Sequence, residues 1–353
     1  MWKNEVKEKM NATLESTKVD LPHGFTARGA TFDDVEAAVK LFNAWAQTTI
    51  HQNEFADAAP LRSEWETPDF NPATDICLVF SPAKELVGYI EVWTIGKPPV
   101  HPWMWGRVHP EFSKLGIGSW LLQWAEERAC KVLDTLPADL HFAPRTGVYS
   151  VAPNSKKLFE DRGFARIRSS YEMRIDMEEA PPTPLWAEGI TLRIANAETD
   201  VRAIYQVDRD SFRDHFGYIE EPFEEGFKRF SHFLLSEGSD PSLWFLAMDG
   251  DQIAGLSICR PSSYDDPDLG WVNLLGVRRE WRKRGIGLAL LQHSFGEFYR
   301  RGKRKVGLGV DAENLTGALK LYERAGMHVH LAFDLFEKTI RSGREISVES
   351  LSE

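Results

Sequence analysis

Apolar positions alternate or recur at helical spacing in a similar order in each half of the chain. The second half predicts strand, helix, two strands, a strand, helix, strand, helix and strand, an order typical of a mixed α/β (α+β) domain. An Asp-Gly turn at 249–250 joins two apolar runs and predicts a β-hairpin. The expected elements include strand 190–194, helix 200–215, strands 243–248, 252–259 and 271–277, and helix 287–299.

Four short segments of the first half recur in the second half in the same order, which indicates a tandem duplication. Val108 and Val277 are separated by the same offset as Gly116 and Gly285. Between the halves, a segment rich in proline and acidic residues lacks periodicity and predicts an extended linker. We expect an N-terminal extension over 1–22, a first domain over 23–178, the linker over 179–189, a second domain over 190–338 and a C-terminal tail over 339–353.

Composition narrows the class of protein. Of the 353 residues, 42% are hydrophobic and 27% are charged, which is enough apolar material for two cores. A net charge of −11 argues against nucleic-acid binding. Three widely spaced cysteines favour a reducing compartment, and no apolar run approaches the roughly 20 residues that span a bilayer. We expect a cytoplasmic monomer or homodimer without membrane or nucleic-acid partners. His328 and His330 lack further ligands, so no metal is expected.

The most informative segment joins the apolar strand 271–277 to the helix 287–299. Gly285 and Gly287 open that helix, where unpaired N–H groups and the helix dipole favour an anion. Glycine has no Cβ, so a phosphate can approach the backbone closely. Five basic residues add positive charge: Arg278, Arg279, Arg282, Lys283 and Arg284. The segment therefore predicts a phosphate-binding turn.

The pattern Arg282-x-x-Gly285-x-Gly287 resembles the acetyl-CoA-binding motif of the GNAT (GCN5-related N-acetyltransferase) superfamily, Arg/Gln-x-x-Gly-x-Gly/Ala. Asn314 and the segment 318–327 resemble a second motif of that family, Asn…Ala-x-x-Leu-Tyr-x-x-x-Gly-Phe. The tandem arrangement is similar to mycothiol synthase-like two-domain acetyltransferases. The resemblance implies two tandem domains, each with a mixed, mostly antiparallel sheet flanked by helices and a splayed parallel strand pair at the cofactor site.

The same resemblance implies an acetyl-CoA-dependent N-acetyltransferase that acts on a small-molecule or peptide amine. Acetyl-CoA (coenzyme A) would lie between strands 271–277 and 306–310, with its pyrophosphate on the glycine turn. Tyr322 would be the catalytic acid that serves the leaving thiolate. The residues expected to hold the cofactor are Leu275, Gly276, Val277, Arg282, Lys283, Arg284, Gly285, Ile286, Gly287, Leu288, Asn314 and Ala318.

The sequence leaves the identity of the general base open. In mycothiol-synthase-like domains a strand glutamate does this work, and Trp271 stands at the corresponding position here. The alternatives are Asp268, Asp311, Glu313 or a water held by Asn273.

The first half departs from the family motifs. Ser113 replaces the Arg or Gln, and Phe159 stands where the second half has Tyr322. We therefore expect a structural or substrate-shaping role for this half. The alternative function for the whole chain is a non-catalytic acyl-CoA-binding or interaction protein on a GNAT scaffold.

Overall fold

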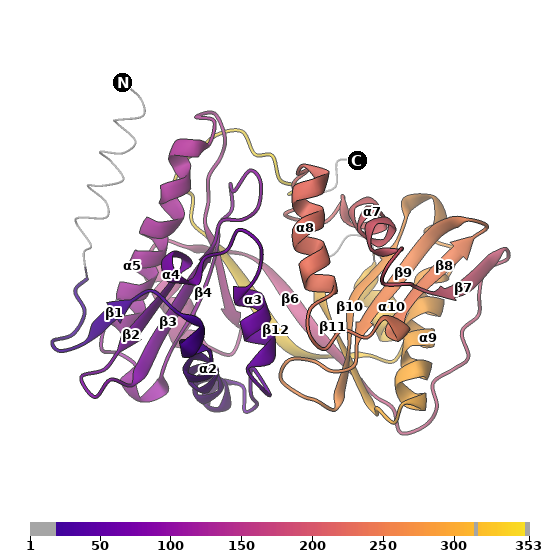
Figure 1. Cartoon of the computed structure of the whole chain (residues 1–353), viewed down its shortest axis with the longest axis horizontal. Coiled ribbons are helices and arrows are strands. Elements are labelled where there is room, and N and C mark those ends of the chain that lie inside the picture. The colour runs from indigo at the N-terminus through magenta and orange to yellow at the C-terminus, as the bar shows by residue number, and fades with distance from the viewer. Residues whose placement is uncertain (1–18, 314–316, 350–353) are drawn as a thin grey trace. The chain divides into compact units, whose positions relative to one another are not determined.

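The structure is a computed structural model that describes residues 19–313 and 317–349 (Figure 1). The chain divides into two compact units, and each is described by itself. Among the described residues, unit 1 comprises 19–168 and 334–346, and unit 2 comprises 169–313, 317–333 and 347–349. Most of the expected N-terminal extension, and Asn314, lie outside the described residues.

Unit 1 is built on a sheet with the strand order β1-β2-β3-β4-β5-β12. Neighbours from β1 to β4 are antiparallel, and β4 and β5 are parallel. Helix α5 covers one face through Ile117 and Leu121, and α2 covers the other face, where the ring of Phe42 meets Tyr89. The bounds are β1 Thr26–Arg28, α2 Val35–Thr49, α3 Ala59–Trp65, α4 Pro72–Asp75, β2 Ile76–Phe80, β3 Leu86–Trp93, β4 Trp103–Val108, α5 Ile117–Cys130, β5 Arg145–Tyr149 and α6 Pro153–Asp161.

Unit 2 has the strand order β6-β11-β10-β9-β8-β7. Only β10 and β11 are parallel among these neighbours. Helix α9 lies under β10, where Phe298 contacts Gly270, and α7 lies on the opposite face, where Ser211 contacts Gly276 (Figure 1). The bounds are β6 Ala165–Asp176, β7 Ile190–Ile194, α7 Val201–Phe212, α8 Phe223–Leu234, β8 Trp244–Asp249, β9 Gln252–Arg260, β10 Leu269–Val277, α9 Ile286–Arg300, β11 Lys305–Asp311, α10 Ala318–Arg324 and β12 His328–Glu337.

Both units have the fold class expected from the sequence, a mixed and mostly antiparallel sheet between helices. Their bounds nevertheless differ from the expected 23–178 and 190–338. Strand β6, the last of the first repeat, pairs along β11, and its Met173 is fully buried in the core of unit 2. The end of β12 contributes Phe336, 1% exposed, to the core of unit 1. The last strand of each repeat is thus divided between the units: most of β6 belongs to unit 2, and the end of β12, from Asp334 onward, belongs to unit 1.

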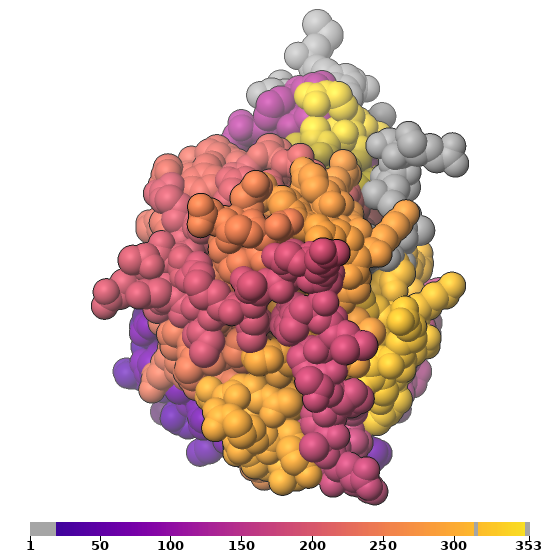
Figure 2. All heavy atoms as spheres, turned by 90° about the vertical axis from the view of Figure 1, so that its right-hand side faces the viewer, coloured from indigo at the N-terminus to yellow at the C-terminus, as the bar shows by residue number. Residues whose placement is uncertain are grey.

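The linker lies on the surface of unit 2. Residues 179–189 contain no helix or strand, yet Trp186 and Ala187 pack against the unit 2 core. The Arg284 Nη2 donates a hydrogen bond of 3.1 Å to the carbonyl of Glu188. In Figure 2 the magenta segment that includes the linker runs along the surface beside orange residues of the same unit. The linker, expected to be an extended spacer, is therefore held against unit 2 by these contacts.

No helix in residues 19–313 and 317–349 is both long and apolar enough to cross a membrane. Within those residues, no group of three or more His, Cys, Asp or Glu side chains is placed to hold a metal ion. The three cysteines are buried free thiols.

Candidate active site

The two parallel strands of unit 2 separate toward their carboxyl ends. β10 and β11 pair from Leu269 as far as Val272 and Leu308. Beyond that point β10 has a register shift between Val272 and Leu274 and continues along β9, whereas β11 continues along β6. This is the splayed pair that the family resemblance implied. A bulge is a common way for one strand to turn away from its neighbour.

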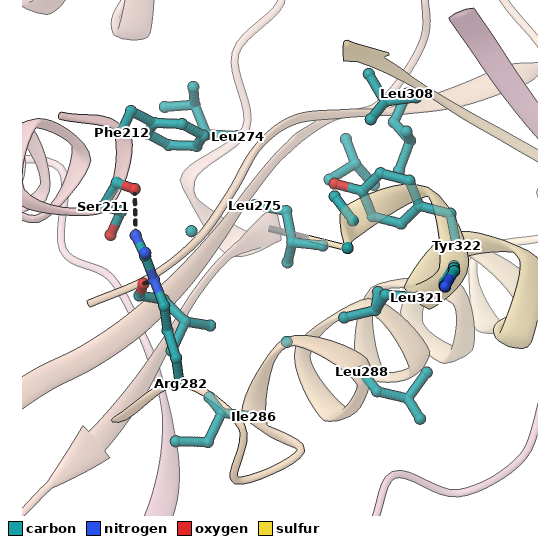
Figure 3. Close-up of a pocket in the computed structure, with 18 of the residues that line it drawn as sticks. Ser211, Phe212, Leu274, Leu275, Arg282, Ile286, Leu288, Leu308, Leu321 and Tyr322 are labelled. Carbon is teal, nitrogen blue, oxygen red and sulfur yellow. Dashed lines mark hydrogen bonds between the residues drawn. The ribbon is translucent and has the colours of Figure 1, made fainter. Parts of the chain in front are cut away.

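A cavity of about 710 Å³ occupies the opening. Its walls come from β10, β11, the first turn of α9, helix α10 and the end of α7 (Figure 3). Arg284 does not line it, and Asn314 is not among the described residues. The structure brings together the other expected residues: Leu275, Gly276, Val277, Arg282, Lys283, Gly285, Ile286, Gly287, Leu288, Ala318 and Tyr322.

Main-chain groups of β10 are available to the cavity. The N–H of Arg278 donates to the carbonyl of Ala254 on β9 at 3.0 Å. Because successive residues of a strand point their main-chain groups in opposite directions, those of Val277 and Leu275 turn away from β9. The carbonyl of Val277 accepts a hydrogen bond of 3.1 Å from Arg282 Nε, which agrees with that direction. The opening is therefore edged by amide groups suited to an extended amide-containing ligand.

The glycine turn has the backbone of an anion cradle. Lys283 has φ of +63° and Gly285 φ of +81°, and α9 begins at Ile286 without a side-chain cap. The N–H groups of 286–288 consequently have no hydrogen-bond acceptor among the described residues. A Cβ on Gly287 would lie 3.2 Å from Leu321 Cδ1, so glycine lets α9 and α10 approach closely there.

Several of the basic residues are bound to the protein itself. The guanidinium of Arg282 donates to the carbonyls of Val277 and Ser211, the latter at 2.8 Å, and pairs with Asp214 at 3.2 Å (Figure 3). Arg279 also pairs with Asp214. The Arg282 side chain therefore connects the end of α7 to the end of β10. No local sequence pattern indicated that Asp214 would be its acidic partner.

Three cations stay unpaired at the rim. Lys283, Lys320 and Arg324 line the cavity, are exposed, and have no ion pair with any described residue. Lys320 and Arg324 are one turn apart on α10, which places both charges near one side of the opening. These three cations, rather than the paired arginines, supply the available positive charge.

Tyr322 lies in the cavity wall with its ring in the core. It is 8% exposed, and burial raises the pKa of its hydroxyl to about 12. That hydroxyl has no hydrogen-bond partner within the described part of the chain. Figure 3 shows it pointing toward Leu275 rather than along α10. The side chain is thus a neutral proton donor facing the opening.

The candidate bases divide into two groups. Asp311 and Asn273 line the cavity. Asp268 is exposed just before the first residue of β10, at the end remote from the opening, and Glu313 is exposed outside the cavity wall. Trp271, at the position of the family glutamate, lies beside Gly307, so it covers the neighbouring strand instead of entering the opening.

Sequence reasoning missed the contribution of α7. Ser211, Phe212 and His215 line the cavity across from α10. A Cβ on Gly276 would lie 3.0 Å from Ser211 Cβ, so the glycine lets α7 rest directly on β10. Gly276 in an otherwise apolar strand was the available signal, because such a glycine marks a close approach by another segment.

The profile of the Acetyltransferase (GNAT) family matches residues 40–147 and 201–327, which is one match in each half of the chain. The chain belongs to the GNAT acetyltransferase family. A GCN5-related N-acetyltransferase from Sphaerobacter thermophilus has a similar structure, with a TM-score of 0.76 and 34% identity, covering 94% of this chain and 100% of that one. The duplication, the fold and the motif resemblance are thereby confirmed.

Among curated GNAT relatives, the mycothiol acetyltransferase of Geodermatophilus obscurus is 29% identical over 231 residues, 63% of this chain and 69% of that protein. A tandem GNAT protein from the clavulanic acid biosynthesis pathway shares the fold, with a TM-score of 0.65 and 15% identity over 91% of this chain and 100% of that one. The chain is therefore an N-acetyltransferase with tandem GNAT domains.

Proposed function

We propose that this enzyme transfers the acetyl group of acetyl-CoA to a primary amine, and that the reaction takes place in unit 2. The observation that carries the proposal is the meeting of three features in one cavity. These are the splayed β10–β11 pair, the glycine turn at the start of α9 and the unpartnered hydroxyl of Tyr322.

The residues of the cavity fit coenzyme A. Unpaired amides at 286–288 suit a pyrophosphate, and the rim cations Lys283, Lys320 and Arg324 suit its further negative charge. Leu275 and Val277 offer main-chain groups to the amides of the pantetheine arm. Ala318 lies at the start of α10, in the wall beside that path. When bound, acetyl-CoA supplies an acetyl thioester, an activated acyl donor.

The chain's own groups then act at defined points. A main-chain N–H on the open edge of β10 stabilises the negative charge that develops on the acetyl oxygen. Tyr322 gives its proton to, or hydrogen-bonds, the sulfur that leaves. Since its pKa is about 12, the hydroxyl stays protonated throughout the neutral range. Apolar walls from Leu274, Leu275 and Phe212 limit water around the reacting atoms.

The acceptor is proposed only as a small-molecule or peptide amine. The relatives' name, mycothiol acetyltransferase, favours a small acceptor. Trp271 occupies the position of the strand glutamate of mycothiol-synthase-like domains, so mycothiol chemistry does not transfer to this chain residue by residue.

The test combines two measurements on the full chain. Calorimetric titration with acetyl-CoA reports binding, and release of free thiol in the presence of a panel of small amines and short peptides reports transfer. We expect binding in the micromolar range or tighter and thiol release with at least one amine. Tight binding without thiol release for any acceptor supports the alternative, a non-catalytic acyl-CoA-binding protein on a GNAT scaffold.

A further inference from the structure

The two faces of β11 carry different chemistry. Val306, Leu308 and Val310 are buried in the core on the α9 side. Since side chains alternate along a strand, Gly307, Gly309 and Asp311 lie on the opposite face, toward α7 and α8. Trp271 lies against Gly307, which places the Trp271 ring on that face as well. Gly309 and Asp311 also line the cavity, so this face borders the opening where an acceptor would enter.

Strand β6 brings a carboxylate to the same face. Glu172 is directly opposite Gly309 in the antiparallel register, and Met173 opposite Leu308 is in the core. Residues directly opposite each other in a ladder point to the same face, so Glu172 stands beside Gly309. Adjacent strands are about 4.8 Å apart. A Cβ on Gly309 would have no neighbour within 4 Å, so the space over Gly309, beside Glu172, is open. Gly309 lines the cavity, and Glu172 stands one strand behind it.

The Glu172 carboxylate is held in place on one side. Arg174 Nε donates to Glu172 Oε1 at 2.5 Å, and Arg174 Nη2 donates to Asp265 at 3.2 Å. Glu172 Oε2 has no hydrogen-bond partner in the described residues. Burial raises the pKa of Glu172 even though Arg174 acts in the other direction. One oxygen is thus fixed, and the other is available to a ligand.

We propose that Glu172 is the base of the active site: it binds the ammonium group of the acceptor amine and removes its proton. This inference rests on the proposed function. One proton passes from the ammonium nitrogen to Glu172, and the lone pair that is freed forms the new C–N bond while the thioester C–S bond breaks. The second proton of that nitrogen goes to the leaving sulfur through the Tyr322 hydroxyl. Glu172 then returns its proton to water.

The strand exchange explains why this residue stands outside the second sequence repeat. Glu172 lies before the linker, yet β6 belongs to the sheet of unit 2. Trp271 leaves β10 without a carboxylate, and Glu172 supplies one from the other side of β11. Asp311, an acidic residue that lines the cavity, accepts the N–H of Glu313 at 3.0 Å and so stabilises its own turn.

The experiment compares two nucleophiles in the full chain. Glycinamide is largely protonated at neutral pH and needs a base, whereas the nitrogen of hydroxylamine is already unprotonated. Wild type and Glu172→Gln are assayed with both, from pH 6 to pH 10, and acetyl-CoA affinity is measured in parallel. Asp176→Asn is the matched control, because Asp176 lies on the same face of β6, is exposed and faces Lys305 in the register.

We expect Glu172→Gln to lower transfer to glycinamide about 100-fold at pH 7, within the ~10²–10⁴-fold range of general base catalysis. Its rate should recover as pH approaches the amine's own pKa, while hydroxylamine transfer and acetyl-CoA affinity stay at the wild-type level. Equal losses with both nucleophiles, or wild-type transfer to glycinamide, would overturn the role of Glu172. A wild type that binds acetyl-CoA but acetylates neither nucleophile contradicts the proposed function itself.

Discussion

The strand–turn–helix segments of the two units have nearly the same backbone. Lys114 and Lys283 have φ of +64° and +63°, and Gly116 and Gly285 have φ of +86° and +81°. A Cβ on Gly118 would lie 3.2 Å from Leu158, as one on Gly287 would from Leu321. The shape of the turn therefore persists in both repeats, because the glycines also serve the packing of two helices. A preserved turn alone does not show that a unit binds a cofactor.

The side chains around the turn differ. Phe159 stands where unit 2 has Tyr322, and its ring packs at 5.3 Å from the ring of Phe336. On the same helix, Lys157 pairs with Asp161 at 2.7 Å, whereas the corresponding residues of α10, Lys320 and Arg324, are both cationic. Unit 1 thus lacks the acid and neutralises the rim charge that unit 2 keeps.

The two units differ most clearly where a helix packs on the fourth strand of the repeat, α7 on β10 in unit 2 and α2 on β4 in unit 1. In unit 2, Gly276 leaves room beneath Ser211. At the corresponding strand position of unit 1, the Arg107 guanidinium lies 3.9 Å from the ring of Trp45 and 4.1 Å from that of Trp105. It is also paired with Glu54, whose side chain is 7% exposed. Large side chains pack this region of unit 1, whereas unit 2 keeps a cavity there, and this contrast supports catalysis in unit 2.

Cutting the chain at the linker should have the largest effect. Fragment 181–353 lacks β6 and the residue after it, which bring Tyr171, Met173, Ile175 and Met177 to the unit 2 core. Burial of such side chains contributes about 1.5–3 kcal/mol each, comparable in sum to the ~5–15 kcal/mol that stabilises a domain. We expect no cooperative thermal transition by circular dichroism. Fragment 169–353, which retains most of β6, is the matched control and should unfold cooperatively; a cooperative transition in 181–353 would refute the importance of the exchanged strand.

Substitution of the first glycine in each turn should affect acetyl-CoA binding in unit 2 but not in unit 1. Gly285→Val forces a β-branched residue to φ of +81° and distorts the start of α9. Loss of two or three phosphate hydrogen bonds, at about 1.5 kcal/mol each, weakens acetyl-CoA binding about 100-fold or more in calorimetric titration.

Gly116→Val imposes the same strain on unit 1 and should leave acetyl-CoA affinity near that of wild type. If Gly116→Val weakens binding as much as Gly285→Val, both turns hold the cofactor and the contrast between the units disappears.

The role of Tyr322 as the acid can be tested by exchanging tyrosine and phenylalanine at positions 322 and 159. Tyr322→Phe removes one hydroxyl and keeps the ring, so we expect kcat to fall about 10- to 100-fold at unchanged acetyl-CoA affinity. Burial raises the pKa of Tyr322 to about 12, so wild-type activity should show no loss from its ionisation below about pH 11. Phe159→Tyr is the matched control and should leave turnover unchanged. Unaltered turnover in Tyr322→Phe would remove the acid from the mechanism.

The smallest expected effect is on the free energy of unfolding, and it comes from Asp208 on α7. Asp208 occupies the buried face of α7 where α2 has Phe42, and no described residue pairs with it. Burial raises its pKa from 3.8 to about 7, so the protonated form favours folding and this contribution is lost as pH rises from about 4 to 7. Asp208→Asn should therefore be more stable than wild type by roughly 1–3 kcal/mol at pH 8, with a smaller gain at pH 5.

Urea denaturation at the two pH values measures this gain. Asp210→Asn is the control on the same helix, because Asp210 is paired with Arg278 at 3.0 Å and its replacement should bring no gain. A gain for Asp208→Asn that does not depend on pH would show that packing, rather than the buried charge, is responsible.

Local sequence patterns predicted most of the helices and strands of unit 2, and the glycine turn at the start of α9. Strand β7 has the expected bounds, 190–194, and α9 begins and ends within one residue of 287–299. The glycine pattern located the anion cradle, and the segment around Tyr322 located the proposed acid. These features are local, because periodicity, turn residues and helix starts are set by neighbours in the chain.

Which strand joins which sheet, and which charged side chains keep no partner, became clear only in the folded chain. β6 pairs with β11 across the duplication, and this brings Glu172 beside Gly309. Arg282 is held by Asp214, in the turn that follows α7, whereas Lys283 has no ion pair with a described residue. Such partners are separated by many residues in the chain, and their pairing depends on which edges and charged groups the folded core brings together. No local pattern encodes that choice.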